Sequence, residues 1–230
     1  MIISHKYRYI FLKTTKTAGT SIEIALSKFS GPDDITTPIN PEDEKIREEL
    51  GYQGPMNYLA PLWGYGFKDF VLLLLRGRRK RWFYNHITAS EIRARVGQQL
   101  WDSYFKFCVE RNPWDRVVSL YYWQNRTEPR LPFSAFIESD APLGLKRKGF
   151  ELYTIDGCVA VDKVCRFENL TEELETVRIK KGIPEKLDLP HAKSQFRKDK
   201  QSYRDIYGEM EKAKIAELFS DEIKLFGYEF

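Results

Sequence analysis

The sequence has few cysteines, few histidines and no long apolar run, and each shortage excludes a class of protein. Its three cysteines and three histidines are dispersed, so neither a disulfide framework nor a metal site is expected. The longest aliphatic run, Val71 to Leu75, is far shorter than the roughly 20 residues that cross a bilayer. No signal peptide is recognised at the start of the chain. We therefore predict a cytoplasmic protein with no membrane span and no metal.

The charge balance is mild. The 37 basic and 33 acidic residues give a net charge of +4, well below that of a dedicated nucleic-acid binder. We expect no nucleic-acid partner, although a local anionic ligand fits a small basic excess. With 230 residues, 42% of them hydrophobic, the chain is long enough for one substantial core. The prediction is one domain over residues 1–230.

Stretches typical of strands alternate with stretches typical of helices. Strands are expected at residues 7–12, 70–75, 104–111 and 159–167. Helices are expected at residues 20–29, 41–50, 88–100, 113–124 and 171–181, with helical periodicity again in 206–226. This alternation predicts an α/β fold with a mainly parallel sheet. Ligands of such folds bind beyond the carboxyl ends of the strands.

Three expected helix starts carry capping signals. Thr20 with Glu23, and Thr88 with Glu91, stand at the spacing of a capping box. Asn112 followed by a proline is typical of an N-cap and a first helical position. The residues just before these helices are therefore expected to lie in turns.

Residues 31–85 are expected to form an irregular insertion or lid that contributes to the acceptor site. Five of the eleven prolines and five of the fourteen glycines lie within residues 31–66. A basic cluster near the end of the insertion is either a solvated surface or a site for an acidic polysaccharide: Arg76, Arg78, Arg79, Lys80 and Arg81. Three tryptophans are either core residues or stacking surfaces for sugar or adenine rings: Trp63, Trp82 and Trp101.

A first candidate site lies between the strand at 7–12 and the next helix. Its residues are Lys16, Thr17, Ala18, Gly19, Thr20 and Ser21. Such a turn directs backbone N–H groups and the positive end of the helix at an anion. The segment lacks the G-x-x-x-x-G-K-[ST] pattern, which disfavours a nucleoside triphosphatase. The alternative is an ordinary loop before a helix that Thr20 caps.

A second candidate site begins where the strand at 104–111 ends. Arg111 is expected to project from the same sheet edge as the first loop, and its guanidinium can bind a phosphate with two parallel hydrogen bonds. Ser119 follows about two turns into the next helix. Two phosphate sites on neighbouring strands indicate a ligand with a phosphate at each end.

Together these two motifs resemble the signatures of the sulfotransferase family, in particular its carbohydrate branch with the heparan and chondroitin enzymes. Lys16–Ser21 resembles the loop for the 5′-phosphosulfate of 3′-phosphoadenosine 5′-phosphosulfate (PAPS), and Arg111 with Ser119 resembles the 3′-phosphate site. The resemblance implies a three-layer, P-loop-like fold and a bacterial-type soluble member. It further implies transfer of a sulfuryl group to a hydroxyl, with release of 3′-phosphoadenosine 5′-phosphate (PAP). A carbohydrate acceptor is expected.

The resemblance also assigns catalytic roles. Lys16 corresponds to the cation that stabilises the leaving oxygen, and His86 to the base that accepts the acceptor's proton. His86 is alternatively a structural histidine bonded to a carbonyl, and a glutamate base is a further possibility. His5 and His191 are poorer candidates. The segment from His191 to Tyr207 resembles the family's covering loop, where three residues are expected to contact the cofactor: Lys193, Ser194 and Arg197.

Two other functions are considered. A nucleotide-dependent phosphoryl transferase resembling a kinase would prefer ATP with Mg²⁺. A non-catalytic module would bind an anionic polymer through residues 76–81 and would be indifferent to PAP. The oligomeric state is not predicted.

Overall fold

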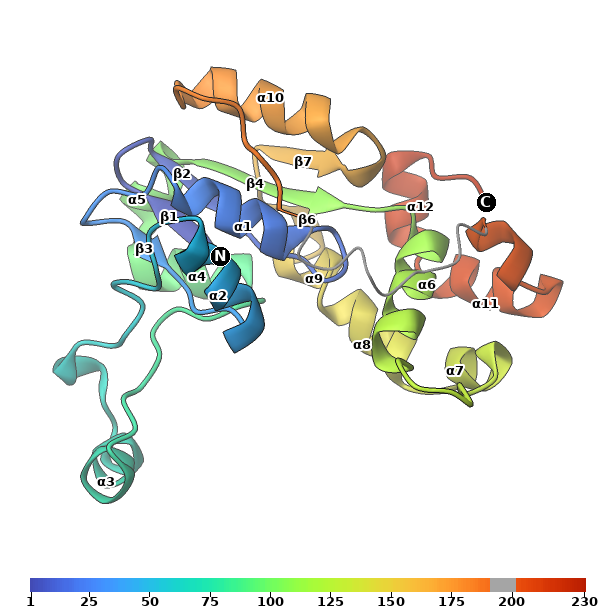
Figure 1. Ribbon diagram of the computed structural model, residues 1–230, viewed down its shortest axis with the longest axis horizontal. Coiled ribbons are helices and arrows are strands. Elements are labelled where there is room, and N and C mark those ends of the chain that lie inside the picture. The colour runs from blue at the N-terminus through green and yellow to red at the C-terminus, as the bar shows by residue number, and fades with distance from the viewer. Residues whose placement is uncertain (191–201) are drawn as a thin grey trace.

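A five-stranded sheet with the order β3-β1-β2-β4-β7 forms the centre of the molecule (Figure 1). The computed structural model describes residues 1–190 and 202–230. The strands of the sheet are β1 (Ile2–Ser4), β2 (Tyr9–Phe11), β3 (Ile35–Thr36), β4 (Phe105–Glu110) and β7 (Lys163–Arg166). A separate hairpin joins β5 (Thr154–Ile155) to β6 (Cys158–Val159).

Most strands of the sheet share one direction. The pairs β2–β4 and β4–β7 are parallel, whereas β1 is antiparallel to both β2 and β3. Strand β3 therefore runs in the same direction as β2, and β1 alone opposes the others. The expected α/β fold with a mainly parallel sheet is confirmed.

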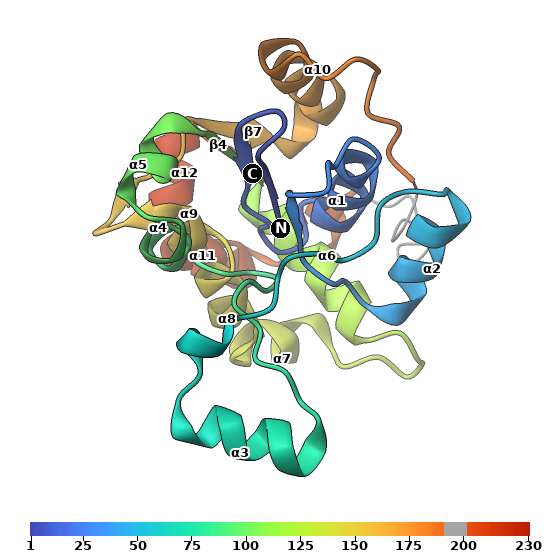
Figure 2. The same cartoon turned by 90° about the vertical axis from the view of Figure 1, so that its left-hand side faces the viewer.

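Helices cover both faces of the sheet and give three layers (Figure 2). Helices α1 (Gly19–Ser27) and α10 (Leu170–Lys181) pack on one face, where Phe11 and Phe107 join Ile22 in a hydrophobic cluster. Helices α4 (Ala89–Val96) and α5 (Gln98–Ser103) pack on the other, where Ile10 and Cys108 contribute to a second cluster. A third cluster joins α6 (Pro113–Gln124), α7 (Phe133–Glu138), α8 (Ala141–Arg147), α11 (Glu209–Leu218) and α12 (Ser220–Phe226).

The other helical elements are shorter or lie at the edges: α2 (Pro41–Glu49), α3 (Phe67–Arg76), α9 (Phe150–Tyr153), and the 3₁₀ turns η1 (Leu62–Gly64), η2 (Phe167–Asn169) and η4 (Tyr203–Ile206). In the described residues, no helix combines the length and the apolar character that crossing a membrane requires.

The strand expected at 70–75 is wrong, because these residues belong to α3. A short apolar run fits a buried strand and a helix equally well, and here the leucines follow a helix start at which the Asp69 carboxylate accepts the Gly66 N–H at 2.9 Å. Gly77, with φ of 61°, ends the helix. Helix α3 projects away from the rest of the protein in both views (Figures 1 and 2).

Other expected elements have different boundaries. The helix expected at 88–100 is divided in two. Helix α4 ends just before Gly97, whose φ is 83°, and Leu100 lies on the separate α5. The strand expected at 159–167 is divided between β6 and β7, and the tail at 206–226 forms α11 and α12. The capping box at Thr88 and the N-cap at Asn112 are confirmed.

Candidate functional site

The loop between β2 and α1 has the backbone of an anion site. Lys16 and Ala18 adopt the left-handed conformation, with φ of 65° and 59°. Helix α1 begins at Gly19, and no side chain caps it. The expected capping box of Thr20 is therefore wrong, because Ala18 occupies the N-cap position. The first N–H groups of α1 and the positive end of its dipole suit an anion.

Gly19 is needed for packing within this loop. A Cβ atom at Gly19 would lie 2.8 Å from Cγ of Lys13 and 3.2 Å from the Thr14 carbonyl oxygen. The absence of a side chain therefore lets the start of α1 approach the end of the preceding strand segment. This role is additional to the close approach of a ligand that the sequence suggests.

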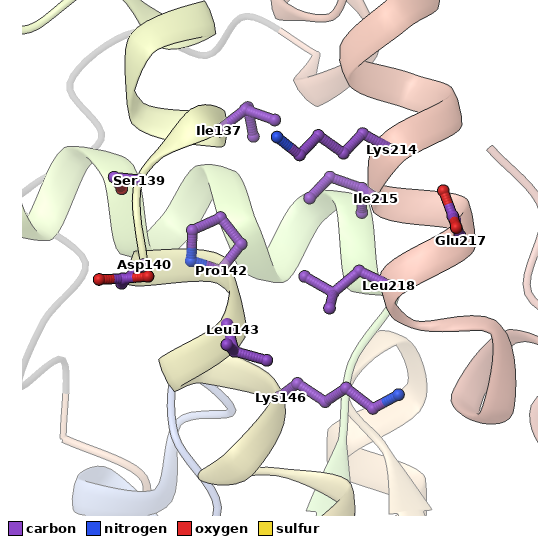
Figure 3. Close-up of a pocket in the computed structure, with 10 residues that line it drawn as sticks. All are labelled: Ile137, Ser139, Asp140, Pro142, Leu143, Lys146, Lys214, Ile215, Glu217 and Leu218. Carbon is purple, nitrogen blue, oxygen red and sulfur yellow. The ribbon is translucent and has the colours of Figure 1, made fainter.

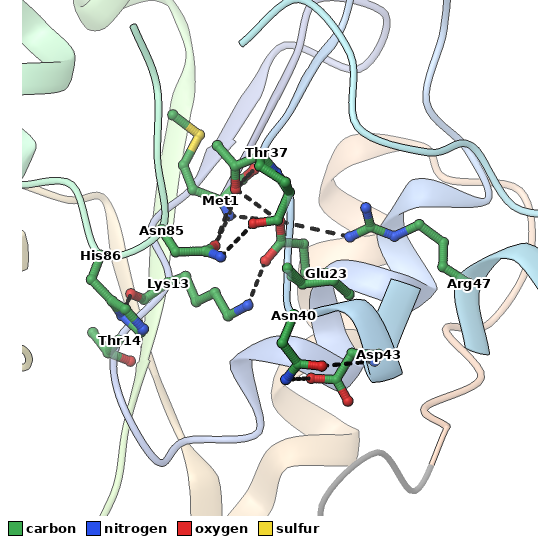
Figure 4. A network of polar contacts seen from close by, with 12 residues as sticks. Met1, Lys13, Thr14, Glu23, Thr37, Asn40, Asp43, Arg47, Asn85 and His86 are labelled. Carbon is green, nitrogen blue, oxygen red and sulfur yellow. Dashed lines mark hydrogen bonds and ion pairs between the residues drawn. The ribbon is translucent and has the colours of Figure 1, made fainter. Parts of the chain in front are cut away.

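The two lysines of the loop have different environments. Lys13 is buried, and its Nζ lies 2.8 Å from the carboxylate of Glu23. The Met1 amino group lies 2.9 Å from the same carboxylate, and the Thr37 hydroxyl donates to it at 3.0 Å (Figure 4). Lys16 is half-buried, and its Nζ lies 5.4 Å from the centre of the Trp123 ring. Lys13 therefore belongs to a buried ionic cluster, whereas Lys16 lies at the surface of the loop.

The Glu23 carboxylate stays ionised inside the protein. Burial alone would raise its pKa, but the nearby cations of Lys13 and the Met1 amino group outweigh burial and lower the pKa to about 2. Glu23 was expected to cap α1, and instead it anchors the strand–loop–helix unit from within. Nothing in the local sequence distinguishes these two roles.

Arg111 brings the second candidate site into contact with the first. Strands β2 and β4 are parallel neighbours, so the segments that follow them lie at the same edge of the sheet. The Arg111 Nη1 donates to the Lys16 carbonyl at 3.2 Å, and Nε and Nη2 bond the Asp115 carboxylate at 2.9 and 2.6 Å. The guanidinium also lies 4.1 Å from the centre of the Phe167 ring. These contacts fix the position of the cation beside the loop.

Ser119 lies on α6 and is half-buried. It stands four residues after Asp115, and residues with this spacing lie on one face of a helix. Because Asp115 holds Arg111, the Ser119 side chain shares the helix face on which the guanidinium rests. Ser119 thus lies one helical turn beyond Asp115, the residue of α6 that binds Arg111.

His86 reaches the same loop from the segment before α4. Its Nδ1 lies 2.9 Å from the Lys13 carbonyl oxygen and 3.3 Å from the Thr15 hydroxyl, and its φ is 60°. A carbonyl oxygen only accepts, so Nδ1 carries the proton and Nε2 is left with a lone pair. Burial, together with the charge of Lys13, lowers the pKa of His86 to about 4. The imidazole is therefore neutral at pH 7.

Arg116 is a buried residue beside the candidate loop that the sequence patterns did not single out. It is fully buried and forms an ion pair of 2.7 Å with Glu110, which is also fully buried. Its Nε donates to the Thr15 carbonyl at 2.8 Å, and its Nη2 donates to the Lys148 carbonyl at 3.1 Å. The Thr15 N–H in turn donates to the same Lys148 carbonyl at 2.9 Å. Both the N–H and the carbonyl of Thr15 are therefore bonded, which holds the candidate loop in place.

Gly149 makes room for this arrangement. A Cβ at Gly149 would lie 2.2 Å from Nη2 and 2.7 Å from Cζ of Arg116. The only sequence signal for Arg116 is its place beside the apolar pair Val117 and Val118 in a segment expected to be helical. That signal does not identify the partners, which lie up to 101 residues away in the chain.

Other expected site residues lie elsewhere. The basic cluster at residues 76–81 is located on the projecting segment around α3, and its arginines are exposed. Trp101 lies in the core, whereas Trp63 is 80% exposed. His5 contacts the Tyr104 hydroxyl at 2.8 Å in the turn before β2, at the opposite edge of the sheet from the loop. Outside the described residues lie His191, Lys193, Ser194 and Arg197.

A surface pocket of about 450 Å³ lies between α8 and α11 (Figure 3). Its apolar wall includes Ile137, Ile215 and Leu218, and Lys146 and Lys214 flank it. None of the residues that the sequence assigned to the donor site lines this pocket. The candidate site is therefore the polar sheet edge around Lys16 and not this pocket.

Three comparisons give relatives of the chain. An uncharacterized protein of Archaeoglobus fulgidus is 40% identical over 103 residues, which are 43% of this chain and 84% of that protein. The crystal structure of mouse sulfotransferase SULT7A1 complexed with PAP covers 96% of this chain and 86% of its own, with 16% identity and a TM-score of 0.45. A sulfotransferase from Alicyclobacillus acidocaldarius covers 96% of both chains, with 15% identity and a TM-score of 0.41.

The sequence profile described as "Sulfotransferase family" matches residues 1–229. The match includes the loop at Lys16, the Arg111 segment and the histidine at position 86. Since it extends over nearly the whole length, this chain belongs to the sulfotransferase family.

Proposed function

We propose that the protein transfers the sulfuryl group of PAPS to a hydroxyl group of a carbohydrate acceptor. The observation that carries the proposal is the contact between Arg111 and the Lys16 carbonyl, which joins two candidate phosphate sites at one sheet edge. A donor that bears a 3′-phosphate and a 5′-phosphosulfate requires two such sites close together. Family membership supports the same donor.

Each end of the donor is assigned to one segment. The uncapped start of α1 and the hydroxyls of Thr20 and Ser21 bind the 5′-phosphosulfate, whereas the buried Thr17 hydroxyl is bonded to Thr14 and supports the loop. Arg111 and Ser119 bind the 3′-phosphate, to which the guanidinium brings charge and directional donors. Lys193, Ser194 and Arg197, which lie outside the described residues, are proposed as further ligands of the donor.

Lys16 acts on the leaving group. The S–O bond to the 5′-phosphate breaks while the acceptor oxygen forms a bond to sulfur on the opposite side, and negative charge develops on the departing oxygen. The Lys16 ammonium stabilises this charge, which lowers the barrier without covalent chemistry. Its replacement by alanine is expected to lower kcat by about 10² to 10³, as for other single donors of this kind.

His86 accepts the proton of the attacking hydroxyl. The Nδ1–H bond to the Lys13 carbonyl supports this role because it leaves the lone pair on Nε2. A pKa of about 4 is low for a base at neutral pH. A bound donor adds negative charge beside the ring, and negative charge favours the imidazolium. Binding of PAPS thus raises the basicity of His86 when a proton is to be accepted.

Calorimetric titration with PAP tests the donor site. Micromolar binding of PAP is expected, with much weaker binding of ATP plus Mg²⁺. Arg111→Ala is expected to weaken PAP binding about 100-fold, because charge-assisted bonds to the phosphate are lost. Arg147→Ala removes an exposed arginine outside the site and serves as the control. A folded protein that does not bind PAP, or that binds ATP more tightly than PAP, would contradict the proposal.

Sulfate transfer from PAPS to a panel of carbohydrates tests the chemistry. His86→Gln is expected to lower kcat by about 10² or more with little change in PAP affinity, because it removes a base and not a phosphate ligand. His5→Gln, at the opposite edge of the sheet, is the matched control. If His86→Gln keeps full activity, the histidine is structural and the proton goes to another group.

A further inference from the structure

The segment around α3 is an exposed, basic and apolar projection. We call residues 59–81 the arm. It leaves the protein at an antiparallel bridge between Leu59 and Arg81, next to a 2.9 Å hydrogen bond from the Ala60 N–H to the Lys80 carbonyl. Helix α3 lies at its far end and extends away from the sheet in both views (Figures 1 and 2). Its surroundings are therefore solvent.

Polar contacts within the arm hold the inner side of α3. The Lys80 Nζ lies 2.7 Å from the Asp69 carboxylate and donates to the Gly64 carbonyl at 2.9 Å. The Lys80 N–H donates to the Tyr65 hydroxyl at 2.9 Å, and the Tyr65 ring packs at 5.3 Å from that of Phe70. These contacts orient the polar side of α3 toward Lys80 and residues 64–65 of the arm.

The opposite side of α3 is apolar and faces water. Phe67, Leu74 and Leu75 are 84%, 83% and 78% exposed, and their spacing of seven and eight residues places them on one face. Trp63, which precedes the helix, is also exposed. Large side chains grouped in this way mark an interaction surface, because burying them is favourable and leaving them in water is not.

The charge of the arm identifies the partner. The arm contains six basic residues and one acidic residue, a net charge of +5, whereas the whole chain carries +4. A second copy of the arm would bring a like charge of +5 to the same surface. A soluble anionic polymer would satisfy the arginines but would leave the apolar face in water. An anionic bilayer satisfies both, with headgroup phosphates for the arginines and an acyl boundary for the apolar side chains.

We propose that the arm binds the surface of an anionic lipid bilayer. The apolar face of α3 lies at the boundary of headgroups and acyl chains, with Trp63 at the headgroup level, where its amphipathic ring is favoured. The arginines at 76, 78, 79 and 81 contact lipid phosphates, which their guanidinium groups match. The inference does not depend on the proposed donor site, because no residue of that site takes part.

Flotation of the full-length protein with vesicles tests the proposal. Vesicles of phosphatidylcholine alone are compared with vesicles that also contain phosphatidylglycerol, at about 0.1 M and about 0.5 M salt. Binding is expected only to the anionic vesicles and is expected to weaken at the higher salt. The emission of Trp63, identified by comparison with Trp63→Phe, is expected to shift to shorter wavelength on binding.

Two sets of substitutions separate the contributions. The apolar set is Phe67→Ser, Leu74→Ser and Leu75→Ser. The basic set is Arg76→Gln, Arg78→Gln, Arg79→Gln and Arg81→Gln. Each set is expected to lower vesicle partitioning by about tenfold or more. A charge-matched control set of exposed residues outside the arm is expected to keep binding within about twofold: Lys45→Gln, Arg147→Gln, Lys186→Gln and Lys224→Gln. Circular dichroism checks that every variant is folded.

Three outcomes would overturn the proposal. The wild-type protein fails to float with anionic vesicles. The apolar set floats as well as the wild type while dextran sulfate competes, which would indicate a site for a soluble anionic polymer. Light scattering finds a dimer that the apolar set converts to monomers, which would make the arm a contact between copies of this chain.

Discussion

Replacement of Arg116 by methionine tests whether the buried ion pair supports the candidate loop. The guanidinium is fully buried, lies 2.7 Å from the Glu110 carboxylate and donates to the Thr15 and Lys148 carbonyls. Its removal leaves a buried carboxylate with the Tyr153 hydroxyl at 3.0 Å and the Arg111 N–H at 3.0 Å as remaining donors. Breaking a buried pair from one side costs about 3 to 5 kcal/mol. The remaining donors place the expected loss near the lower limit, about 3 kcal/mol.

Urea unfolding followed by tryptophan fluorescence measures this loss, and PAP titration measures its effect on the loop. In the double variant Glu110→Gln/Arg116→Met the unpaired charge is absent, so about 1 to 2 kcal/mol of stability is expected to return. Arg116→Lys keeps the charge but not the fork that bonds two carbonyls. It is expected to fold and to bind PAP about tenfold more weakly through a displaced loop.

Two results would refute this reasoning. A loss below about 1 kcal/mol in Arg116→Met would mean that the pair contributes no more than an exposed ion pair. Equal PAP affinity in Arg116→Lys and the wild type would mean that the loop keeps its shape without the two carbonyl bonds.

Three further predictions concern Gly149, Glu222 and His86. Gly149→Ala is expected to lower the free energy of unfolding by about 1 to 3 kcal/mol, because its Cβ would overlap Arg116. Gly54→Ala, where a Cβ has open space, should be close to neutral. Equal unfolding midpoints of the two variants in urea would contradict this. The fully buried Glu222 carboxyl has its pKa raised to about 7 by burial and the nearby Glu110 charge, so its contribution to stability is present at low pH and lost as the pH rises through 7. From pH 5 to pH 8 the free energy of unfolding of the wild type, measured in urea, should therefore fall by about 2.5 kcal/mol relative to that of Glu222→Gln. If the two free energies change in parallel with pH, the carboxyl is ionised throughout this range. The His86 ring, with a pKa of about 4, should give at pH 6 the NMR shifts of a neutral ring protonated at Nδ1. Binding of PAP should raise this pKa. A ring that titrates above pH 6 without PAP would contradict the effect of burial.

Much of the fold follows from local sequence. Asn112 with Pro113, and Thr88 with Glu91, begin helices as their spacing predicts, because an N-cap needs only residues within one turn. The alternation of strand and helix patterns gives the α/β class, and parallel neighbours bring the ends of β2 and β4 together. Proximity of Lys16 and Arg111 follows from that topology, so the centre of the site could be predicted.

Local patterns fail where several structures satisfy them equally. The apolar run at 70–75 fits a strand and a helix, and it forms α3 because no neighbouring strand pairs with it among the described residues. Thr20 and Glu23 have the spacing of a capping box, yet Glu23 pairs with Lys13 and the Met1 amino group. Inside the protein the low dielectric strengthens the attraction between Glu23 and these two cations, and the carboxylate pairs with them.

Residues close together in the chain were enough to predict the class of fold and two candidate phosphate-binding segments with their family signatures. Tertiary structure alone decided how the loop at Lys16 is held in place. Arg116 and Gly149 act on that loop from segments up to 134 residues away from Thr15 in the chain. It also decided that the basic cluster shares the arm with an exposed apolar helix face. Such contacts depend on which elements pack together, and packing is a property of the whole chain that no short pattern contains.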